Sequence, residues 1–240
     1  MKISIVVPAF NEERLLGTSL AQIKSAASVF ARRDWAVELI VCDNNSTDRT
    51  AEIARNAGAL VTFEPVNQIA RARNRGAAAA TGDWLVFVDA DSRPSAELFG
   101  EVANQIASGR CLAGGATVRL DDCHWLAQGV NAIWNLFSRG FRLLAGSFIF
   151  CETAGFRKLG GFSEELFAGE ELELSQRLKK LAGENGKRIV VLHRHPIATS
   201  ARKVYLYSFR EHFRLITRAA FNRRILTSRE ACHLWYDGRR

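Results

Sequence analysis

Two acidic side chains follow a short, wholly apolar run of the chain. The run Trp84–Val88 is rich in β-branched and aromatic residues and too short for a helix, so it predicts a buried, parallel strand. Asp89 and Asp91 come directly after it, where open α/β sheets bind ligands. Neighbouring carboxylates repel each other unless a cation joins them, and hard divalent cations prefer carboxylate oxygen. The stretch therefore indicates a Mg²⁺ or Mn²⁺ site that holds a diphosphate.

Asp is also common in turns, which allows a purely structural interpretation of the same stretch. Asp89 can cap the turn, and Asp91 can lie before a helix that starts after Pro94. From this stretch alone the two interpretations are equally supported.

The chain before Asp89 alternates between strand and helix patterns. Short apolar runs predict strands, and stretches with helical periodicity between them predict helices, the first of them capped by Asn11. The expected strands are Ile3–Val7, Val37–Cys42 and Ala59–Phe63, and the expected helices follow Asn11 or cover Arg49–Ala57 and Gln68–Ala80. This order predicts an α/β fold, a Rossmann-like and mostly parallel sheet flanked by helices. Neither GxGxxG nor GxxxxGK[ST] occurs, so a dinucleotide fingerprint and a P-loop are not supported.

The pattern is looser after Asp91, and no linker or repeat divides it. The stretch Trp125–Leu144 is amphipathic and aromatic, which fits either a core helix or an element that faces a membrane. The other expected elements are a helix over Ala96–Ala107, a strand over Leu112–Leu120, a helix over Glu170–Leu181 and a strand over Ile189–Leu192.

Positive charge is concentrated in the last quarter of the chain. Residues 187–240 hold 13 Lys/Arg and three Asp/Glu, a net of +10, whereas the whole chain has +8. A helix predicted from Val204 to Ile225 would carry a basic stripe beside an apolar face. The stripe is Arg210, Arg214 and Arg218, and the face is Phe209, Phe213, Ile216 and Ala220. Such a helix can lie on an anionic membrane or pack on the sheet with its arginines in solvent.

The bulk composition is that of a globular protein in a reducing compartment. The five cysteines are widely spaced without a CxxC pair, which fits reduced thiols. No apolar stretch is long enough to span a bilayer, and Pro8 with two acidic residues interrupts the N-terminal run as a signal peptide. We expect a cytoplasmic protein, either free or peripheral at the inner face of the cell membrane.

Four motifs in order resemble glycosyltransferase family 2. They are VVPAFNEE, VCDNNSTD, ARARNRGAAAATGDWLVFVDADSRP and GGFSEELFAGEELELSQRLKK, and together they cover roughly residues 3–182. The resemblance implies the GT-A fold, a single nucleotide-sugar-binding α/β domain. We expect residues 1–203 to form this catalytic domain, with 204–240 as a basic amphipathic helical tail of the same unit.

The resemblance also implies roles for individual residues. One group is expected to bind the nucleotide sugar: Pro8, Ala9, Glu12 and Asp43 at the nucleoside, Arg71 and Asn74 between base and diphosphate, Asp89 and Ala90 on the ribose side, and Arg202 closing on the diphosphate. Asp91 would ligate Mg²⁺ or Mn²⁺ directly, with Asp89 also on the metal side. Apart from the resemblance, Asp43 can simply cap a turn, and the polar residues of the Arg71 helix can form a solvated face.

In the family the general base is usually the Asp of a Glu-Asp pair before a helix. Here the pair is Glu170-Glu171, and Glu171 takes the Asp position with a side chain longer by one methylene. Either glutamate can be the base, and both could instead only stabilise the dipole of the helix that they begin. The QxxRW motif of processive synthases is absent, since Gln176 is followed by RLKK, and this favours transfer of a single sugar.

The predicted function is an inverting, metal-dependent glycosyltransferase. It would move one sugar from a nucleoside-diphosphate sugar, a UDP-sugar by default, to an acceptor hydroxyl or phosphate. The basic tail suggests an anionic, cell-envelope acceptor such as a polyprenyl phosphate, and nucleic acid is not favoured. The alternatives are a nucleotidyltransferase, although its usual Gly-rich N-terminal loop is missing, and a non-catalytic nucleotide-binding protein whose basic tail binds membrane or nucleic acid.

Overall fold

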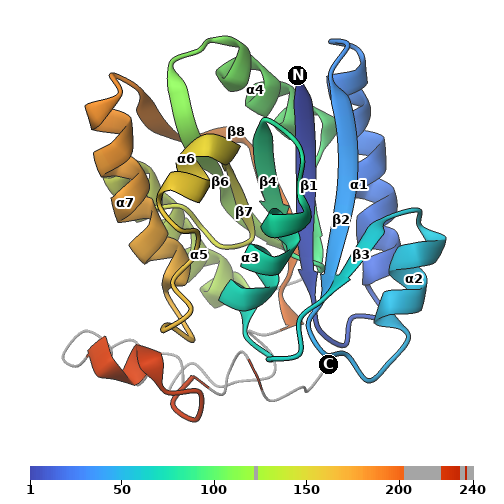
Figure 1. Ribbon diagram of the computed structural model, residues 1–240. Coiled ribbons are helices and arrows are strands. Elements are labelled where there is room, and N and C mark those ends of the chain that lie inside the picture. Colours follow the sequence, from blue (N-terminus) through green and yellow to red (C-terminus); the bar gives the residue numbers. More distant parts are fainter. Residues whose placement is uncertain (122–123, 203–222, 233–235, 237–240) are drawn as a thin grey trace.

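The computed structural model describes residues 1–121, 124–202, 223–232 and 236, and it shows one curled sheet between two layers of helices (Figure 1). The eight strands have the order β3-β2-β1-β4-β7-β6-β8-β5. They are β1 (Lys2–Ala9), β2 (Ala36–Asp43), β3 (Leu60–Phe63), β4 (Trp84–Val88), β5 (Ser92–Arg93), β6 (Cys111–Asp121), β7 (Phe148–Glu152) and β8 (Arg188–Ser200). The helices are α1 (Leu16–Ala31), α2 (Thr50–Asn56), α3 (Ile69–Ala79), α4 (Ala96–Ala107), α5 (Trp125–Phe141), α6 (Thr153–Lys158) and α7 (Glu170–Glu184), with a 3₁₀ turn η1 (Arg223–Thr227).

The two halves of the sheet differ in strand direction. The half formed by β3, β2, β1 and β4 is parallel throughout, as predicted, with Val6 of β1 paired to Ile40 and to Phe87. In the other half β7 runs antiparallel to both β4 and β6, while β6 and β8 are parallel. The parallel half therefore places the carboxyl ends of β1, β2 and β4 at one edge, where the predicted site residues lie.

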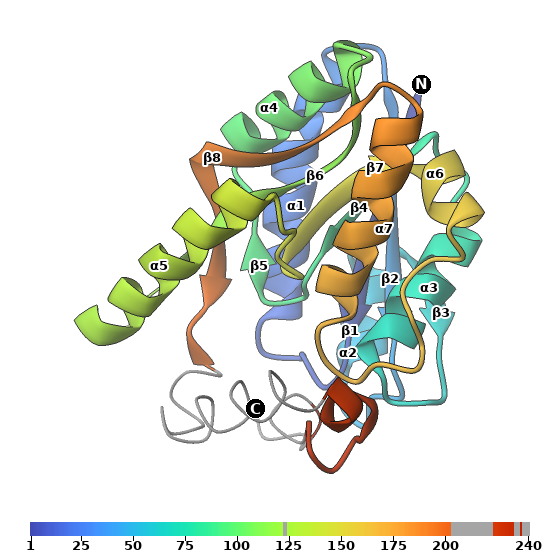
Figure 2. The same ribbon diagram turned by 90° about the vertical axis from the view of Figure 1, so that its left-hand side faces the viewer.

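Each face of the sheet has its own apolar core. Ile5 and Val86 point to the face covered by α1 and α4, whereas Val6 and Phe87 point to the face covered by α3, α6 and α7 (Figures 1 and 2). A strand that is buried on both faces needs apolar residues at consecutive positions. This explains the continuous apolar runs of β1 and β4.

Most predicted elements agree with the structure, and the differences have local reasons. β4 and α4 match their predicted bounds at both ends. β7 and α6 were not predicted, and β8 is longer than Ile189–Leu192. The predicted cap at Asn11 is wrong: α1 begins at Leu16, and Asn11 has φ 51 and accepts the N–H of Thr47 at 2.8 Å.

α5 projects from the body of the molecule (Figure 2). Its attachment is polar, because Asn131 and Asn135 donate to the carbonyl of Val118 at 2.7 and 2.8 Å. Large apolar side chains on the rest of the helix are exposed, so the core interpretation is wrong for them. They are Trp125, Val130, Ile133, Leu136, Phe137 and Phe141.

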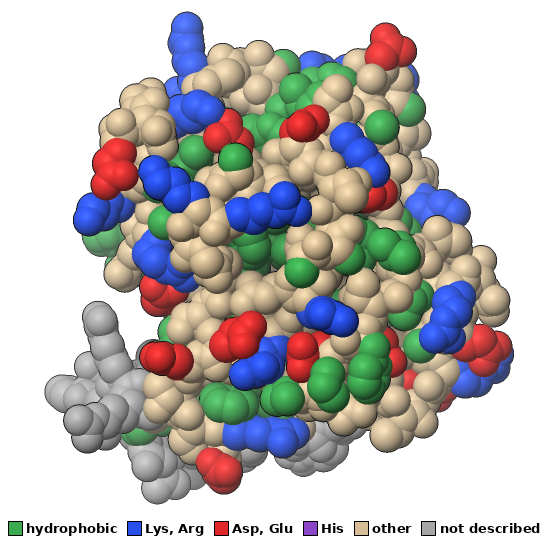
Figure 3. All heavy atoms as spheres, viewed as in Figure 1, with side chains coloured by type: hydrophobic (Ala, Val, Ile, Leu, Met, Phe, Trp, Pro, Cys, Tyr) green, Lys and Arg blue, Asp and Glu red, His purple; other side chains and the backbone are tan. Residues whose placement is uncertain are grey.

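Two predictions about the C-terminal region are not tested. The predicted helix from Val204 to Ile225, with its arginine stripe, lies almost wholly outside the described residues, and the division at residue 203 stays a prediction. In the described part of the chain, no helix is both long and apolar enough to cross a bilayer. On the face seen in Figure 3, the described acidic and basic side chains are interspersed.

Candidate active site

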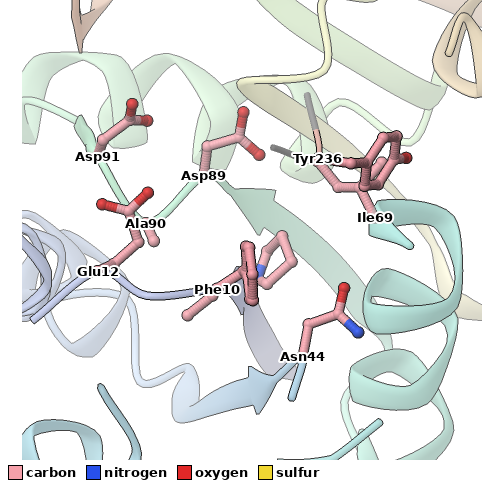
Figure 4. Close-up of a pocket in the computed structure, with 10 residues that line it drawn as sticks. Phe10, Glu12, Asn44, Ile69, Asp89, Ala90, Asp91 and Tyr236 are labelled. Atoms are coloured by element: carbon pink, nitrogen blue, oxygen red, sulfur yellow. The ribbon is translucent and has the colours of Figure 1, made fainter. Parts of the chain in front are cut away.

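A cleft lies at the carboxyl ends of β1 and β4, and most of the predicted nucleotide-binding residues line it. The space within it, open solvent included, is about 530 Å³. The predicted residues that line it are Pro8, Ala9, Glu12, Asp89, Ala90 and Asp91. Figure 4 shows Asp89 and Asp91 leaving β4 on the same side as Glu12, with Tyr236 and Ile69 across the cleft.

The turn after β4 directs two carboxylates toward one cleft. Ala90 is buried between Asp89 and Asp91, and the N–H of Ser92 bonds back to the carbonyl of Asp89 at 2.9 Å. Among the described residues no group of three or more His, Cys, Asp or Glu side chains could enclose a metal. Mg²⁺ typically takes one or two carboxylates and completes its shell with water and substrate phosphates. The two aspartates therefore fit a metal that arrives with a diphosphate.

Arg202, which follows the end of β8, lies near both Glu12 and Asp91. The guanidinium of Arg202 donates to both carboxylate oxygens of Glu12, at 2.7 and 3.1 Å, and lies 3.8 Å from Asp91. Burial lowers the pKa of Arg202, but the bonds to Glu12 and the charge of Asp91 outweigh it and raise the pKa. A permanent cation thus stands where the diphosphate of a donor is expected.

A second arginine, Arg73 of α3, connects Asp89 to the acid pair. It donates to Glu170 at 2.7 Å and to Asp89 at 3.0 Å, and its side chain is 2% exposed. Burial lowers the pKa of Arg73, yet the charges of Asp89 and Glu170 raise it overall. Arg73 was not among the predicted site residues, which included Arg71 on the same helix.

The acid pair begins α7 and its two members have different surroundings. Gly169 precedes them with φ 75, a conformation that favours glycine. Glu170 is buried and ion-paired to Arg73, whereas Glu171 is half-buried. Burial, and then the charge of Glu170, raise the pKa of Glu171 above its usual 4.5 despite the opposing effect of Arg73. Such a shift is typical of catalytic carboxylates.

The predicted residues outside the lining of this cleft are Asp43, Arg71, Asn74, Arg202 and the acid pair, and their roles toward a donor stay predictions. Asp43 accepts the N–H of Ser46 at 3.0 Å, as expected of a turn cap. Arg71 pairs with Glu164 at 3.3 Å. Asn74 exchanges two hydrogen bonds of 2.9 Å with the backbone of residue 162, in the loop that leads to the acid pair.

The cleft also contains residues that the sequence did not suggest. They are Phe10, Asn44, Ile69 and Tyr236. Asn44 follows Asp43 in a turn-forming stretch, which is the one available signal. No sequence pattern pointed to Tyr236, because it reaches the cleft only through tertiary packing. Its hydroxyl donates to the carbonyl of Phe167 at 2.9 Å.

Comparison with solved structures identifies the class as the GT-A fold. A mannosyltransferase from Pyrobaculum calidifontis in complex with GDP-Man and Mn²⁺ gives a TM-score of 0.70 at 19% identity, covering 96% of this chain and 64% of that one. Glucosyl-3-phosphoglycerate synthase from Mycobacterium tuberculosis, in complex with Mn²⁺, UDP and glucosyl-3-phosphoglycerate, gives 0.64 at 21%, covering 97% and 80%. At such identities the likeness establishes the fold alone.

The family follows from the sequence. The model of glycosyl transferase family 2 matches residues 4–158, more than half of the chain, so the chain belongs to this family. An uncharacterized glycosyltransferase of Mycobacterium bovis is 31% identical over 123 residues, which are 51% of this chain and 52% of that protein. The matched stretch covers about half of the length of this relative and about a quarter of the length of another curated relative.

Proposed function

We propose that this protein is an inverting, metal-dependent glycosyltransferase that moves one sugar from a nucleoside-diphosphate sugar to an acceptor. The observation that carries the proposal is the link between Asp89 and the acid pair through Arg73, beside a cleft that both Asp89 and Asp91 line. A metal-binding turn and a candidate base thereby belong to one site. The solved relatives that contain UDP or GDP-Man with Mn²⁺ support the choice of donor and metal.

Asp91 and Asp89 would hold the Mg²⁺ or Mn²⁺ ion. When bound, the metal supplies Lewis-acid stabilisation of the charge that develops on the leaving diphosphate. Arg202 would exchange its bonds to Glu12 for phosphate oxygens, because a guanidinium donates to phosphate in the same planar geometry. Pro8, Ala9, Glu12 and Asn44 would surround the nucleoside.

Glu171 is the better placed candidate for the general base, because Glu170 already accepts a bond from Arg73. In an inverting transfer the acceptor oxygen bonds to the anomeric carbon as its proton passes to the base. The bond from the anomeric carbon to the diphosphate oxygen breaks, and the nucleoside diphosphate leaves with that electron pair. The raised pKa of Glu171 makes it a proton acceptor of more than usual strength for a carboxylate.

A donor screen tests the proposal. UDP-glucose, UDP-N-acetylglucosamine and GDP-mannose are incubated with the protein and Mn²⁺, and release of nucleoside diphosphate is measured. Thermal shift with UDP or GDP, with and without Mn²⁺, gives an independent measure of binding. Metal-dependent stabilisation together with release supports a glycosyltransferase, whereas stabilisation without turnover supports the non-catalytic nucleotide-binding alternative. Release of inorganic pyrophosphate from nucleoside triphosphates would instead indicate a nucleotidyltransferase.

We further propose an anionic lipid acceptor, such as a polyprenyl phosphate, and peripheral contact of α5 with the cytoplasmic face of the membrane. Asn131 and Asn135 attach α5 to the body, so its apolar side chains are left on the other side of the helix. α5 contains no acidic residue, and Arg139, Arg142 and Lys179 lie at its C-terminal end. An apolar face with basic residues beside it is typical of helices that lie on anionic membranes.

Vesicle co-sedimentation tests this contact. The protein should bind vesicles of phosphatidylcholine with phosphatidylglycerol, and bind less at high salt. Ile133→Asp with Phe137→Asp should abolish the binding, whereas Phe63→Asp, at an exposed aromatic residue on β3, should not. Equal recovery of wild type in the supernatant with phosphatidylcholine alone and with the mixed vesicles would contradict membrane contact. Loss of dimers in the α5 variant would instead assign the face to a second copy of the chain.

A further inference from the structure

Arg73 is among the most deeply buried charged groups of the described chain. It lies on α3, which presents three arginines at alternate positions: Arg71, Arg73 and Arg75. Arg75 is exposed and Arg71 is half-buried, but the side chain of Arg73 is 2% exposed. A buried charge is costly unless it is paired and hydrogen-bonded. Both terminal nitrogens of Arg73 are hydrogen-bonded, whereas its buried Nε has no hydrogen-bond partner among the described residues.

The partners of Arg73 come from three separate segments. One terminal nitrogen donates to Glu170 of α7 at 2.7 Å, and the other donates to Asp89 after β4 at 3.0 Å. The second nitrogen also donates to the carbonyl of Gly146 at 2.8 Å. A Cβ at Gly146 would lie 3.0 Å from this nitrogen, so a side chain there would press on the guanidinium. The guanidinium thus bonds to the metal-side aspartate and to the acid pair at once.

The segment around Gly146 also connects Asp89 to α7, through hydrogen bonds of its own backbone. The carbonyl of Ser147 accepts the N–H of Asp89 at 3.3 Å, and the N–H of Leu144 donates to the hydroxyl of Ser175 at 3.0 Å. That hydroxyl in turn donates to the carbonyl of Glu171 at 2.6 Å. The stretch 144–147 therefore touches both ends of the site that Arg73 joins, and it holds the first turn of α7 in place.

We propose that Arg73 is the positioning residue of this site: it fixes the metal-side Asp89 relative to the acid pair, and by engaging Glu170 it leaves Glu171 as the base. The inference rests on the proposed glycosyltransfer. A base must meet the acceptor proton at the face opposite the departing diphosphate, so the relative placement of the two acidic elements limits the rate. An arginine suits this task because its planar fork presents separate nitrogens to the two carboxylates in a fixed geometry, whereas the donors of a lysine rotate about one nitrogen.

The competing interpretation is that Arg73 only neutralises the buried charge of Glu170. The two interpretations separate in the double variant Arg73→Met with Glu170→Gln, which removes the ion pair and leaves no unpaired charge at Glu170. Replacement of a buried ion pair by uncharged groups is often tolerated. If neutralisation were the whole role, this variant would behave like the Glu170→Gln single variant.

The experiment measures Mn²⁺-dependent UDP affinity by calorimetry, donor turnover as nucleoside diphosphate release, and folding by urea titration. We expect the folded double variant to bind Mn²⁺–UDP about tenfold more weakly than Glu170→Gln and to turn over about 10²-fold more slowly. Arg73→Lys should fold and show losses in the same direction. Arg75→Met, on the exposed side of α3, serves as the matched control and should resemble wild type.

The positioning role, the assignment of the base and the proposed function can each be contradicted by a different result. Wild-type-like affinity and turnover in Arg73→Lys, or a double variant equal to Glu170→Gln, would overturn the positioning role. A dead Glu170→Gln variant with normal Mn²⁺–UDP affinity would show that Glu170 is the base and overturn the assignment to Glu171. Absence of both nucleotide binding and turnover in wild type would instead contradict the proposed function, which the wild-type arm tests separately.

Discussion

Two arginine clusters lie on either side of the same aspartate turn, and they are built differently. In the Arg73 cluster (Arg73, Asp89 and Glu170) the guanidinium is 2% exposed and bonds carboxylates of two segments at 2.7 and 3.0 Å. In the Arg202 cluster (Arg202, Glu12 and Asp91) the guanidinium is 16% exposed, and its second carboxylate lies 3.8 Å away. The first arginine is held by short bonds on both sides, the second on one side only.

This difference indicates which guanidinium can exchange its partners when a donor binds. Breaking a buried, hydrogen-bonded ion pair leaves an uncompensated charge, so the Arg73 cluster should keep its geometry when a donor binds. In the Arg202 cluster, Glu12 and Asp91 line the cleft, and phosphate oxygens can replace carboxylate oxygens as acceptors for the guanidinium. We therefore expect variants of the Arg73 cluster to change stability as well as function, and variants of the Arg202 cluster to change function alone.

The largest functional effect is expected for Asp91→Ala. Removing the proposed metal ligand should eliminate metal-dependent nucleotide binding and reduce turnover by about 10³-fold or more, since a metal contributes several kcal/mol to stabilising the transition state. The midpoint of urea unfolding should change little, because Asp91 lies 3.8 Å from Arg202 and forms no short ion pair with it. Mn²⁺ titration by calorimetry, with and without UDP, measures the binding. Wild-type turnover in this variant would exclude the metal role of Asp91.

Arg73→Met should have the largest effect on stability. It leaves Glu170 buried and unpaired, which costs about 3–5 kcal/mol of unfolding free energy. Urea unfolding followed by circular dichroism measures the loss, and Arg202→Met on the other cluster provides the comparison. Equal destabilisation by both substitutions would remove the distinction between the clusters.

Glu171→Gln should preserve folding and Mn²⁺–UDP affinity while lowering transfer by about 10²-fold or more, the usual contribution of a general base. Steady-state turnover and calorimetry on the same preparation measure both effects. Glu170→Gln is the matched control in the neighbouring position. If both variants keep wild-type turnover, the base lies elsewhere in the chain.

The stability and the activity of the protein should depend on pH in opposite directions because of the acid pair. The pKa of Glu171 is raised above 4.5 by burial and by Glu170, so the folded protein binds this proton more tightly than the unfolded chain. Its contribution to stability is then present below pH 4.5 and is lost as pH rises through the raised pKa. Turnover should rise over the same interval as the carboxylate forms. Urea unfolding and turnover at several pH values test this, and Glu171→Gln should remove this component from the stability profile.

The smallest effect is expected for Arg202→Lys. The lysine keeps the charge but loses the paired geometry of the guanidinium, so Mn²⁺–UDP affinity should fall about tenfold, equivalent to ~1.4 kcal/mol. Unfolding free energy should stay within ~0.5 kcal/mol of wild type, as for most substitutions outside the core. An unchanged nucleotide affinity would mean that Arg202 only neutralises Glu12.

The parallel half of the sheet and the aspartate turn could be predicted from the sequence alone. Trp84–Val88 is apolar at every position because the strand is buried on both faces, and this property is local enough to give both ends of β4. The motifs around Asp89 and Asp91 also identified the family and two cleft-lining carboxylates. β7 was missed although Phe148–Cys151 is apolar, because its antiparallel insertion between β4 and β6 depends on pairing with distant strands.

Which arginine of α3 belongs to the site could not be predicted without the tertiary structure. The sequence places Arg71, Arg73 and Arg75 on one helix but does not give the rotation of that helix against the sheet. The partners that make burial of Arg73 tolerable, Asp89 and Glu170, are 16 and 97 residues away along the chain. A buried charge is tolerated because of partners that only folding brings together, and the sequence around Arg73 does not reveal which residues these are.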